Sequence, residues 1–541
     1  MLKKTKKILF IIPPFFHVND YLSKEITAKL PLFTVPYGVL SLAAYGKAYS
    51  RYDVKTRIID LNLEVYKRCE ICSEIGTEIE NIVEETMKQF RPDIVGISLL
   101  FNTCYKYLGM ISTSIKKMDA DAVLVVGGGL ATNLANELLA DFPYVDAACF
   151  GEGEIPLCQL LDADDADACF KAYPAWITRN SLRERRIPQG IFVQNLDDIP
   201  FFDYSLIDVD EYTGRAIDKV HSTPGTRQFS IHTSRGCPFD CVFCASGTVH
   251  GKKMRFMSVE RVVAEVEELK SSYGMNVLAI EDDHFLADKG RAKHILRRLA
   301  GLNLRIEMPN GTAVYAIDDE IGSLLANAGV SSVSLAVESG SDYVLKNIIN
   351  KPLKARMIRT AALSMRKNGI NVHALFIIGF PGETEEHREE TMRTILDVGF
   401  DWVYFNIAVP IAGSRLYDLC KEKGYLVNAD PAEYISTKCN IRTPGIDPAY
   451  IEQKAYLMNL EANFVRNYNL RAGDYHKASL YFGDITKNYP DHAFAHYFLA
   501  KSLRAVGKGD ETTARHENAF LHLVGTNTTW ERYAKHFNLV Q

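Results

Sequence analysis

Three closely spaced cysteines are the residues of this sequence best suited to chemistry: Cys237, Cys241 and Cys244. Thiolates at this spacing can bind three irons of a cubane cluster and leave the fourth iron without a protein ligand. Structural iron–sulfur sites normally supply four ligands, so an open iron indicates a site that binds an exchangeable molecule. We therefore predict a [4Fe–4S] cluster with these three cysteines as its metal ligands.

Two other interpretations of the triad are weaker. Unrelated core cysteines would rarely share this spacing in a loop directly after a predicted strand. A zinc site needs a fourth ligand, and His232 and His250 flank the triad at unsuitable separations. The other cysteines form no such cluster. Cys69 and Cys72 make a CxxC-like pair in a predicted helix, where a packing or surface role is expected.

The composition is typical of a soluble globular protein. Of 541 residues, 47% are hydrophobic and 24% charged, and no run of about 18 apolar residues could span a bilayer. The net charge of −5 argues against a nucleic-acid partner, because duplex binders usually carry a basic field. Eleven cysteines without an export signal do not indicate a disulfide framework. We therefore expect a protein of the reducing cytoplasm.

Residues 1–160 alternate short apolar runs with amphipathic stretches of helix length, which predicts a parallel sheet with crossover helices. The predicted strands are Ile8–Ile12, Thr56–Ile59, Ile94–Ser98, Val123–Val126 and Ala147–Phe150. The predicted helices are Tyr37–Lys47, Glu74–Phe90 and Tyr105–Lys117. Glycines follow the last two strands at 127–129 and 151–153, on the edge where open α/β sheets bind ligands.

Residues 161–225 are predicted to be a linker, since periodicity fades, prolines recur and acidic residues cluster at 162–167. From 226 to 424, six strand–helix units predict a partial barrel with its chemistry at the strand ends. The strands are expected at Gln228–Thr233, Val277–Ile280, Leu304–Glu307, Ser332–Val337, Val372–Ile378 and Trp402–Ala408. The helices are expected at Val259–Tyr273, Lys289–Leu299, Asp318–Ala328, Lys354–Asn368 and Glu385–Val398.

Residues 425–541 are predicted to be helical. Gly473, Ala478, Pro490 and Ala500 mark a pattern that resembles one tetratricopeptide helix pair. One repeat is too short for a solenoid, so we expect a packing region, with a partner-binding array as the alternative.

The triad, written CxxxCxΦC with Phe243 as the aromatic residue, resembles the hallmark of the radical S-adenosylmethionine (SAM) superfamily. Further matching landmarks occur in order at 281–283, 338–340, 379–384 and 409–414. In the first domain, 8–14, 36–38, 91–98 and 150–154 are similar to the cobalamin-binding domain of one large subgroup, and 195–200 is similar to its linker. The implied fold is α/β: a Rossmann-like cobalamin-binding domain, a partial (βα)6 barrel and a helical C-terminal region.

The resemblance implies that the open iron chelates SAM and that a donor such as flavodoxin or ferredoxin reduces the cluster. Carboxylates at strand ends suit the ribose and ammonium groups of SAM, although such residues also serve as helix caps or solvated charges. The residues expected to bind SAM are Phe243, Glu281, Asp283, Glu338, Ser339, Gly379 and Gly382. Those expected to bind cobalamin are Pro36, Gly38, Ser98, Gly127, Gly128, Gly129, Gly151, Glu152 and Gly153.

The first domain departs from the methionine synthase pattern, because no Asp-x-His-x-x-Gly occurs in residues 1–170. A histidine of that motif therefore cannot be the lower cobalt ligand. His17 is the only histidine in this region, and a loop histidine is more often incidental than a ligand.

The leading function is methyl transfer to an unactivated carbon of a small molecule of unknown class, through methylcobalamin and a 5′-deoxyadenosyl radical. The nearest alternative is a cobalamin radical enzyme that rearranges, cyclises or couples its substrate. Methylthio transfer would need a second three-cysteine cluster, which Cys69, Cys72, Cys104 and Cys149 are not spaced to form. A cobalamin-binding sensor is a further alternative, but a sensor has no need of an open iron.

Overall fold

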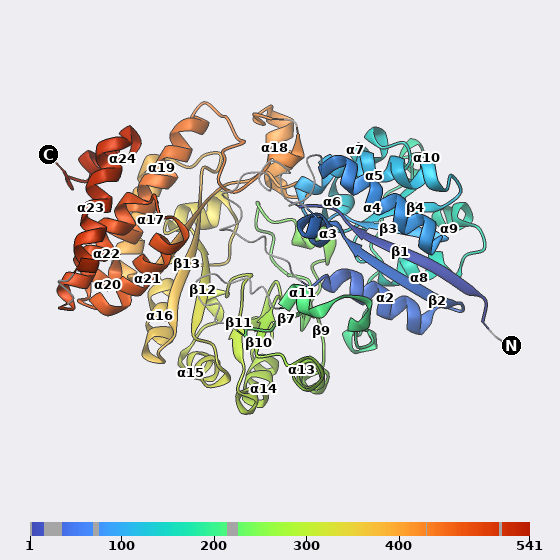
Figure 1. The fold of residues 1–541 in the computed structure, drawn as a ribbon, viewed down its shortest axis with the longest axis horizontal. Helices are drawn as coiled ribbons and strands as arrows, with labels where there is room; N and C mark the ends of the chain where they lie inside the picture. Colours follow the sequence, from blue (N-terminus) through green and yellow to red (C-terminus); the bar gives the residue numbers. More distant parts are fainter. Residues whose placement is uncertain are drawn as a thin grey trace. The chain divides into compact units, whose positions relative to one another are not determined.

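The computed structural model describes residues 3–15, 35–68, 75–213, 225–428, 430–507 and 511–540. They form two compact units, Met1–Ile306 with Pro410–Ile435, and Glu307–Val409 with Ser436–Gln541. Figure 1 follows the chain from blue to red. Among the described residues, no helix is long and apolar enough to cross a membrane. His17, Cys69 and Cys72 lie outside the described residues.

A six-stranded sheet is the centre of the amino-terminal part of unit 1. Its order is β2-β1-β3-β4-β5-β6, with β6 antiparallel to β5 and all other neighbours parallel. The strands are β1 (Thr5–Ile12), β2 (Asp53–Asp60), β3 (Ile94–Ser98), β4 (Val123–Gly127), β5 (Ala147–Cys149) and β6 (Trp176–Ile177). All five predicted strands are present, and β6 is an addition.

Helices cover both faces of this sheet (Figure 1). One face carries α3 (Leu61–Arg68), α4 (Ile75–Phe90), α5 (Tyr105–Met118), α6 (Gly129–Asn133) and α7 (Ala135–Asp141). The other carries α2 (Tyr37–Tyr49), α8 (Glu154–Asp162) and α9 (Ala166–Ala172). In β1, Leu9 and Ile11 belong to the first core and Ile8 and Phe10 to the second. Burial on both faces explains why the central strands β1, β3 and β4 contain continuous apolar runs in the sequence.

The sheet extends into the segment that we predicted to be a linker. Helix α9 begins after Asp165, whose side chain accepts a hydrogen bond from the Asp167 backbone N–H. Strand β6 follows and pairs with β5, and α10 (Arg179–Arg183) starts with a capping box between Thr178 and Ser181. Part of the acidic run at 162–167 is therefore a helix cap, and the first domain continues past residue 160.

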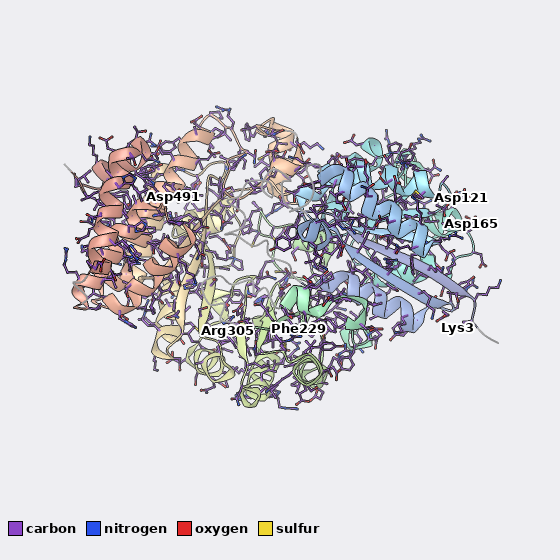
Figure 2. All side chains as sticks on the ribbon, in the orientation of Figure 1. Lys3, Asp121, Asp165, Phe229, Arg305 and Asp491 are labelled. Atoms are coloured by element: carbon purple, nitrogen blue, oxygen red, sulfur yellow. The ribbon has the colours of Figure 1, made fainter. Side chains whose placement is uncertain are left out.

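The remainder of unit 1 contains the first half of the predicted barrel. Strand order in its sheet is β11-β10-β7, and β7 and β10 are parallel. The elements are α11 (Val209–Thr213), β7 (Gln228–Ile231), β8 (Ser234–Arg235), α12 (Ser246–Val249), β9 (Arg255–Phe256), α13 (Val259–Tyr273), β10 (Val277–Ile280), α14 (Lys289–Leu299), β11 (Arg305–Glu307) and α18 (Arg415–Lys423). The side chain of Phe229 on β7 is fully buried (Figure 2).

Unit 2 contains the second half of the predicted barrel and the helical tail. Its sheet has the parallel order β12-β13-β14. The strands and their helices are α15 (Asp319–Ala328), β12 (Ser332–Glu338), α16 (Ala355–Lys367), β13 (Asn371–Ile378), α17 (Glu385–Val398) and β14 (Trp402–Ile407). The tail comprises α19 (Pro448–Leu460), α20 (Tyr468–Arg471), α21 (Tyr475–Asn488), α22 (Ala493–Ala505), α23 (Glu511–Thr526) and α24 (Thr528–His536). All six predicted barrel strands are present.

The tail packs against the edge strand β14. A core of tail residues, including Phe464, Phe482 and Phe498, is completed by Trp402 of β14. The amide of Asn463 accepts from the Val403 N–H at 2.8 Å and donates to the Val403 carbonyl at 2.7 Å. An edge strand has backbone groups that need partners, so the tail covers and satisfies this edge.

Candidate functional site

The three cysteines lie in one loop, residues 236–254, which we call the cysteine loop. Strands β8 and β9 close its base by pairing Ser234 with Phe256 and Arg235 with Arg255. Gly236 has a φ of 93°, and a Cβ there would lie 2.6 Å from the Lys253 carbonyl oxygen. Only glycine allows the two ends of the loop to approach this closely.

A buried carboxylate holds the strand that leads into the cysteine loop. Asp282 accepts from the Thr233 N–H at 2.5 Å, from the Thr233 hydroxyl at 2.6 Å and from the Ser234 hydroxyl at 2.5 Å. Burial raises the pKa of Asp282, and these hydrogen bonds act in the opposite direction. Its neighbours Glu281 and Asp283, which the sequence predicts to bind SAM, have hydrogen-bond partners that differ from those of Asp282.

The cysteine loop fits an iron–sulfur cluster. Cys237 and Cys241 are half-buried and Cys244 is exposed, so the thiols are accessible. The Ser246 N–H donates to the Cys244 sulfur at 3.4 Å, a contact that suits a thiolate. Over the described ranges, no three His, Cys, Asp or Glu side chains are gathered as ligands of one metal ion. Cubane ligands each bind a different iron, so they need positions around a cluster rather than one shared point.

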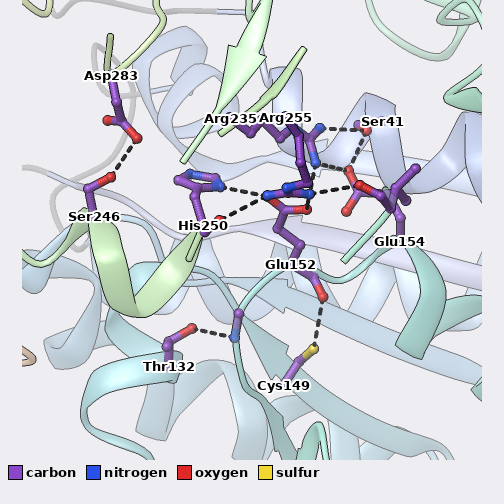
Figure 3. A network of polar contacts seen from close by, with 12 residues as sticks. Ser41, Thr132, Cys149, Glu152, Glu154, Arg235, Ser246, His250, Arg255 and Asp283 are labelled. Carbon is purple, nitrogen blue, oxygen red and sulfur yellow. Dashed lines mark hydrogen bonds and ion pairs between the residues drawn. The ribbon is translucent and has the colours of Figure 1, made fainter. Parts of the chain in front are cut away.

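Two of the predicted SAM ligands flank the cysteine loop within unit 1. Glu281, at the end of β10, accepts from the Ser230 hydroxyl at 2.6 Å, and burial raises its pKa. The Nε2 of His232 lies 3.7 Å from a Glu281 oxygen. Asp283 accepts from the hydroxyl of Ser246, just after the last cysteine, as Figure 3 shows. The half-buried Phe243 lies in the loop itself.

The other predicted SAM ligands lie in unit 2, at the ends of β12 and β13. Glu338 is buried with a φ of 67°, and Lys351 Nζ lies 3.0 Å from its carboxylate. Ser339 contacts the Thr391 hydroxyl at 3.2 Å. Gly379 and Gly382 both have positive φ, and a Cβ at Gly379 would lie 2.9 Å from Ile451. These four predicted ligands lie at or just after the carboxyl ends of β12 and β13, as the sequence predicts.

A further buried carboxylate in unit 2 was missed. Glu383 accepts from the Gly379 N–H at 2.6 Å and lies 3.3 Å from Arg388 Nη1. Burial raises the pKa of Glu383 to about 7, although both partners favour the ionised form. It follows the predicted glycines directly in the sequence, so its position in the landmark at 379–384 was the available signal.

The residues expected to bind cobalamin at the carboxyl end of β4 differ in how much free space surrounds their Cα atoms. Gly128 has a φ of 104°, and a Cβ there would lie 2.6 Å from the Leu99 carbonyl oxygen. Beside it, a Cβ at Gly127 or Gly129 would meet nothing closer than 3.9 Å. The half-buried Ser98 ends β3 opposite Gly127. These residues lie on one edge of the sheet, where a ligand of an open α/β fold binds.

The other cobalamin candidates have distinct surroundings. Pro36 is the N-cap of α2, and the exposed Gly38 has no heavy atom within 4 Å of an added Cβ. A Cβ at Gly151 would lie 3.2 Å from the Phe192 ring and 3.3 Å from the Val249 carbonyl oxygen. At Gly153, it would lie 3.0 Å from Leu42. Protein atoms therefore pack against Gly151 and Gly153, and contact with cobalamin stays a prediction.

Glu152 forms a buried network of charged groups that the sequence did not reveal. We use the name Glu152 network for Glu152, Glu154, Arg235, His250 and Arg255, which Figure 3 shows converging from three segments. Burial would raise the pKa of Glu152, but hydrogen bonds from Arg255 and His250 and the charge of Arg235 lower it to about 2. The carboxylate is therefore ionised at neutral pH. His250, which we had considered as a zinc ligand, points to this carboxylate.

Comparisons with known proteins identify both of the domains that carry these residues. The B12-binding domain family matches residues 24–161, and the radical SAM superfamily matches residues 231–395. Cytidylyl-2-hydroxyethylphosphonate methyltransferase of Streptomyces wedmorensis is 29% identical over 475 residues, 82% of this chain and 87% of the relative. The anaerobic magnesium-protoporphyrin IX monomethyl ester cyclase of Rubrivivax gelatinosus is 27% identical, over 72% of this chain and 68% of its own length.

A solved structure has the same fold. The cobalamin-dependent SAM radical enzyme OxsB, with aqua-cobalamin and SAM bound, has a TM-score of 0.63 and 14% identity. The match covers 100% of this chain and 82% of that one. The predicted architecture, a Rossmann-like domain followed by radical SAM strands and a helical C-terminal region, is therefore confirmed.

Proposed function

The chain belongs to the radical SAM superfamily and carries a B12-binding domain, and from this premise we propose that it is a cobalamin-dependent methyltransferase acting on an unactivated carbon of a small molecule. One observation carries the proposal: the cysteine loop packs against the carboxyl edge of the Rossmann-like sheet, since Val249 lies against both Gly129 and Gly151. The predicted cluster ligands and the predicted cobalamin edge are thus neighbours within unit 1.

The residues of the chain have separable roles in this proposal. When bound, the cluster with SAM and the cobalamin would supply a radical initiator and a methyl carrier. Cys237, Cys241 and Cys244 would hold the cluster, and Asp283, which Ser246 fixes beside the loop, would bind a polar group of SAM. The open positions at Gly127 and Gly129 would leave room for the corrin.

The relatives favour methyl transfer. A methyltransferase aligns over most of the chain, and its name specifies transfer of a methyl group to a cytidylyl-linked hydroxyethylphosphonate. A cyclase aligns over a smaller share, and cyclisation without methyl transfer is the alternative that the experiment below tests. An external reductant such as flavodoxin or ferredoxin and a cytoplasmic location are parts of the same proposal.

An isotope experiment tests the choice between the two reactions. Anaerobically reconstituted enzyme is incubated with a reductant, deuterated-methyl SAM and a small-molecule extract of the source cells. We expect new metabolites that carry the CD3 group, together with equal amounts of S-adenosylhomocysteine and 5′-deoxyadenosine, because methyl transfer and radical formation each use one SAM. The variant with all three cysteines replaced by alanine is the blank.

The opposite result is equally clear. If the extract stimulates 5′-deoxyadenosine formation but neither S-adenosylhomocysteine nor a labelled metabolite forms, the methyltransferase proposal is wrong and rearrangement or cyclisation replaces it. If the triple cysteine variant retains a full brown cluster, the assignment of the metal ligands is wrong as well.

A further inference from the structure

We propose that Glu152 is a positioning residue: its carboxylate binds both ends of the cysteine loop and thereby fixes that loop on the carboxyl edge of the Rossmann-like sheet. The proposal deepens the function above, because it concerns how the two predicted cofactor sites are held together. Its structural part is independent of which reaction the enzyme catalyses.

The carboxylate of Glu152 is nearly saturated with donors from the barrel part of unit 1. Arg255 donates to both oxygens, from Nη2 at 2.6 Å and from Nη1 at 2.8 Å. The Nδ1 of His250 lies 2.9 Å from Oε1, and Arg235 Nη1 lies 3.3 Å from Oε2. A bidentate arginine–carboxylate contact fixes the orientation of the two side chains as well as their separation.

These donors come from opposite ends of the cysteine loop. Arg235 lies just before Cys237, whereas His250 and Arg255 follow Cys244. The pairing of β8 with β9 joins the two ends, and Glu152 adds a contact to each from a different domain. These contacts hold the base of the loop to the first domain.

A second carboxylate supports only one of the two ends. Glu154 accepts from Arg235 Nη1 at 2.8 Å and from the Ser41 hydroxyl at 2.7 Å. Figure 3 shows Glu154 on the Arg235 side, away from His250. The side chains of Glu152, Arg235 and Arg255 are at most 7% exposed. Buried charges of this kind depend on each other, since removing one leaves the others unpaired.

The backbone beside Glu152 places this network at the predicted cobalamin edge. The Gly151 N–H donates to the Thr132 hydroxyl at 3.1 Å, which ties the loop after β5 to the helix after β4. Val249 reaches both glycine turns, because its side chain faces Gly129 and its carbonyl faces Gly151. A shift of the cysteine loop would therefore change its distance from the turn at 127–129. Transfer between two cofactors is sensitive to such displacements.

Hydrogen exchange tests the structural part directly. In cluster-loaded Glu152→Gln, we expect amides of residues 236–254 to exchange at least about tenfold faster, because lost hydrogen bonds to a charged group lower the cost of local opening. Strands β1 and β3 should keep their protection, and iron content should be unchanged. Glu152→Asp keeps the charge and should retain most of the loop protection.

The matched control is Glu265→Gln. Glu265 is also a buried carboxylate of unit 1, and its ion pair at 3.3 Å is with Arg261 of the same helix, α13, instead of with a residue of the cysteine loop. This variant should leave exchange in 236–254 as in the wild type. Unchanged loop exchange in Glu152→Gln, or equal acceleration in Glu265→Gln, would overturn the proposal.

Two further measurements keep the test decisive. If Glu152→Gln does not fold, Glu154→Gln weakens the contacts to Arg235 and Ser41 and leaves those of His250 and Arg255 in place, so it should accelerate exchange near Cys237 but not near His250. No local change near Cys237 would refute the network. In folded Glu152→Gln, the ratio of S-adenosylhomocysteine to 5′-deoxyadenosine should fall while 5′-deoxyadenosine formation persists. If no variant forms S-adenosylhomocysteine, the proposed reaction fails, yet the exchange result still decides the role of Glu152.

Discussion

Single residues at the carboxyl end of β4 decide which substitution can report on cobalamin. A side chain at Gly128 would clash with the Leu99 carbonyl oxygen in a positive-φ conformation, so any effect there mixes folding with binding. Gly129 has no such limit, because an added Cβ meets nothing closer than 3.9 Å. Gly129 is therefore the better steric probe of the predicted corrin site.

We expect Gly129→Leu to weaken cobalamin retention and to leave iron content unchanged. Overpacking costs about 1–3 kcal/mol, which lowers affinity by about one to two orders of magnitude. The measurement is cobalt and iron per chain after reconstitution. Gly301→Leu is the control, since Gly301 is exposed and open but far along the chain in the barrel part. Normal cobalt in Gly129→Leu would place the corrin elsewhere.

His232 gives a prediction for pH. Burial first, and then the charge of Arg235, lower its pKa to about 3. The unfolded chain therefore binds a proton at His232 below about pH 6.5, whereas the folded chain does not until about pH 3. The contribution of neutral His232 to stability is present above pH 6.5 and is lost as the pH falls through this window.

Comparison of His232→Asn with the wild type measures how much the free energy of unfolding depends on protonation of His232. The wild type should lose up to about 2 kcal/mol more stability between pH 7 and pH 5 than the variant. Thermal unfolding of both proteins at the two pH values gives the difference. Parallel losses in both would mean that folding does not lower the pKa of His232. The ring of Tyr37 lies 4.6 Å from the imidazole, so asparagine also removes a ring contact, which acts equally at both pH values.

Elements differ in how far the sequence predicts them. Most of the strands contain short apolar runs, so β1 to β5 and the six barrel strands are predicted close to their observed positions, although β2 begins at Asp53, before the predicted start at Thr56. The two-residue strands β6, β8 and β9 are too short to carry a period. Helix α9 was missed because the acidic residues around Asp165 looked like a linker, whereas one of them is its cap.

The contact between the segment Glu461–Val465, which follows α19, and strand β14 leads to an element-scale prediction. Asn463 makes two buried hydrogen bonds to the backbone of Val403. Asn463→Ala leaves these groups without partners, so we expect a loss of about 1–3 kcal/mol in the free energy of unfolding. Denaturant unfolding measures it. Asn488→Ala, which removes only a bond to Asp484 in the same helix, should cost much less. Equal effects would show that Asn463 does not secure the edge.

At the scale of the whole molecule, local sequence patterns predict candidate ligands but do not predict how distant segments support them. The cysteines are close in the chain, so their spacing alone leads to the prediction of a cluster. Glu152 and Arg255 are separated by more than a hundred residues, and no local pattern links them. The glycine spacing predicts a ligand at 151–153. The structure shows that residues of the barrel part of unit 1, Val249 and Arg255, contact this turn. Only the fold brings such partners together.

The helical tail lies in unit 2, whereas the predicted cluster and cobalamin ligands lie in unit 1, so removing the tail should affect stability and cofactor binding separately. Tyr481 of α21 stacks on Trp402 and lies 2.8 Å from the His373 ring nitrogen, while Lys477 pairs with the buried Asp401. Removing residues 474–541 would expose these groups on β13 and β14, so we expect reduced solubility and stability before any loss of cluster or cobalamin. Iron, cobalt and 5′-deoxyadenosine formation are measured on whatever fraction stays soluble. A truncated protein that is fully soluble and normal in all three, but forms no product, would instead indicate that the tail binds the substrate or a partner.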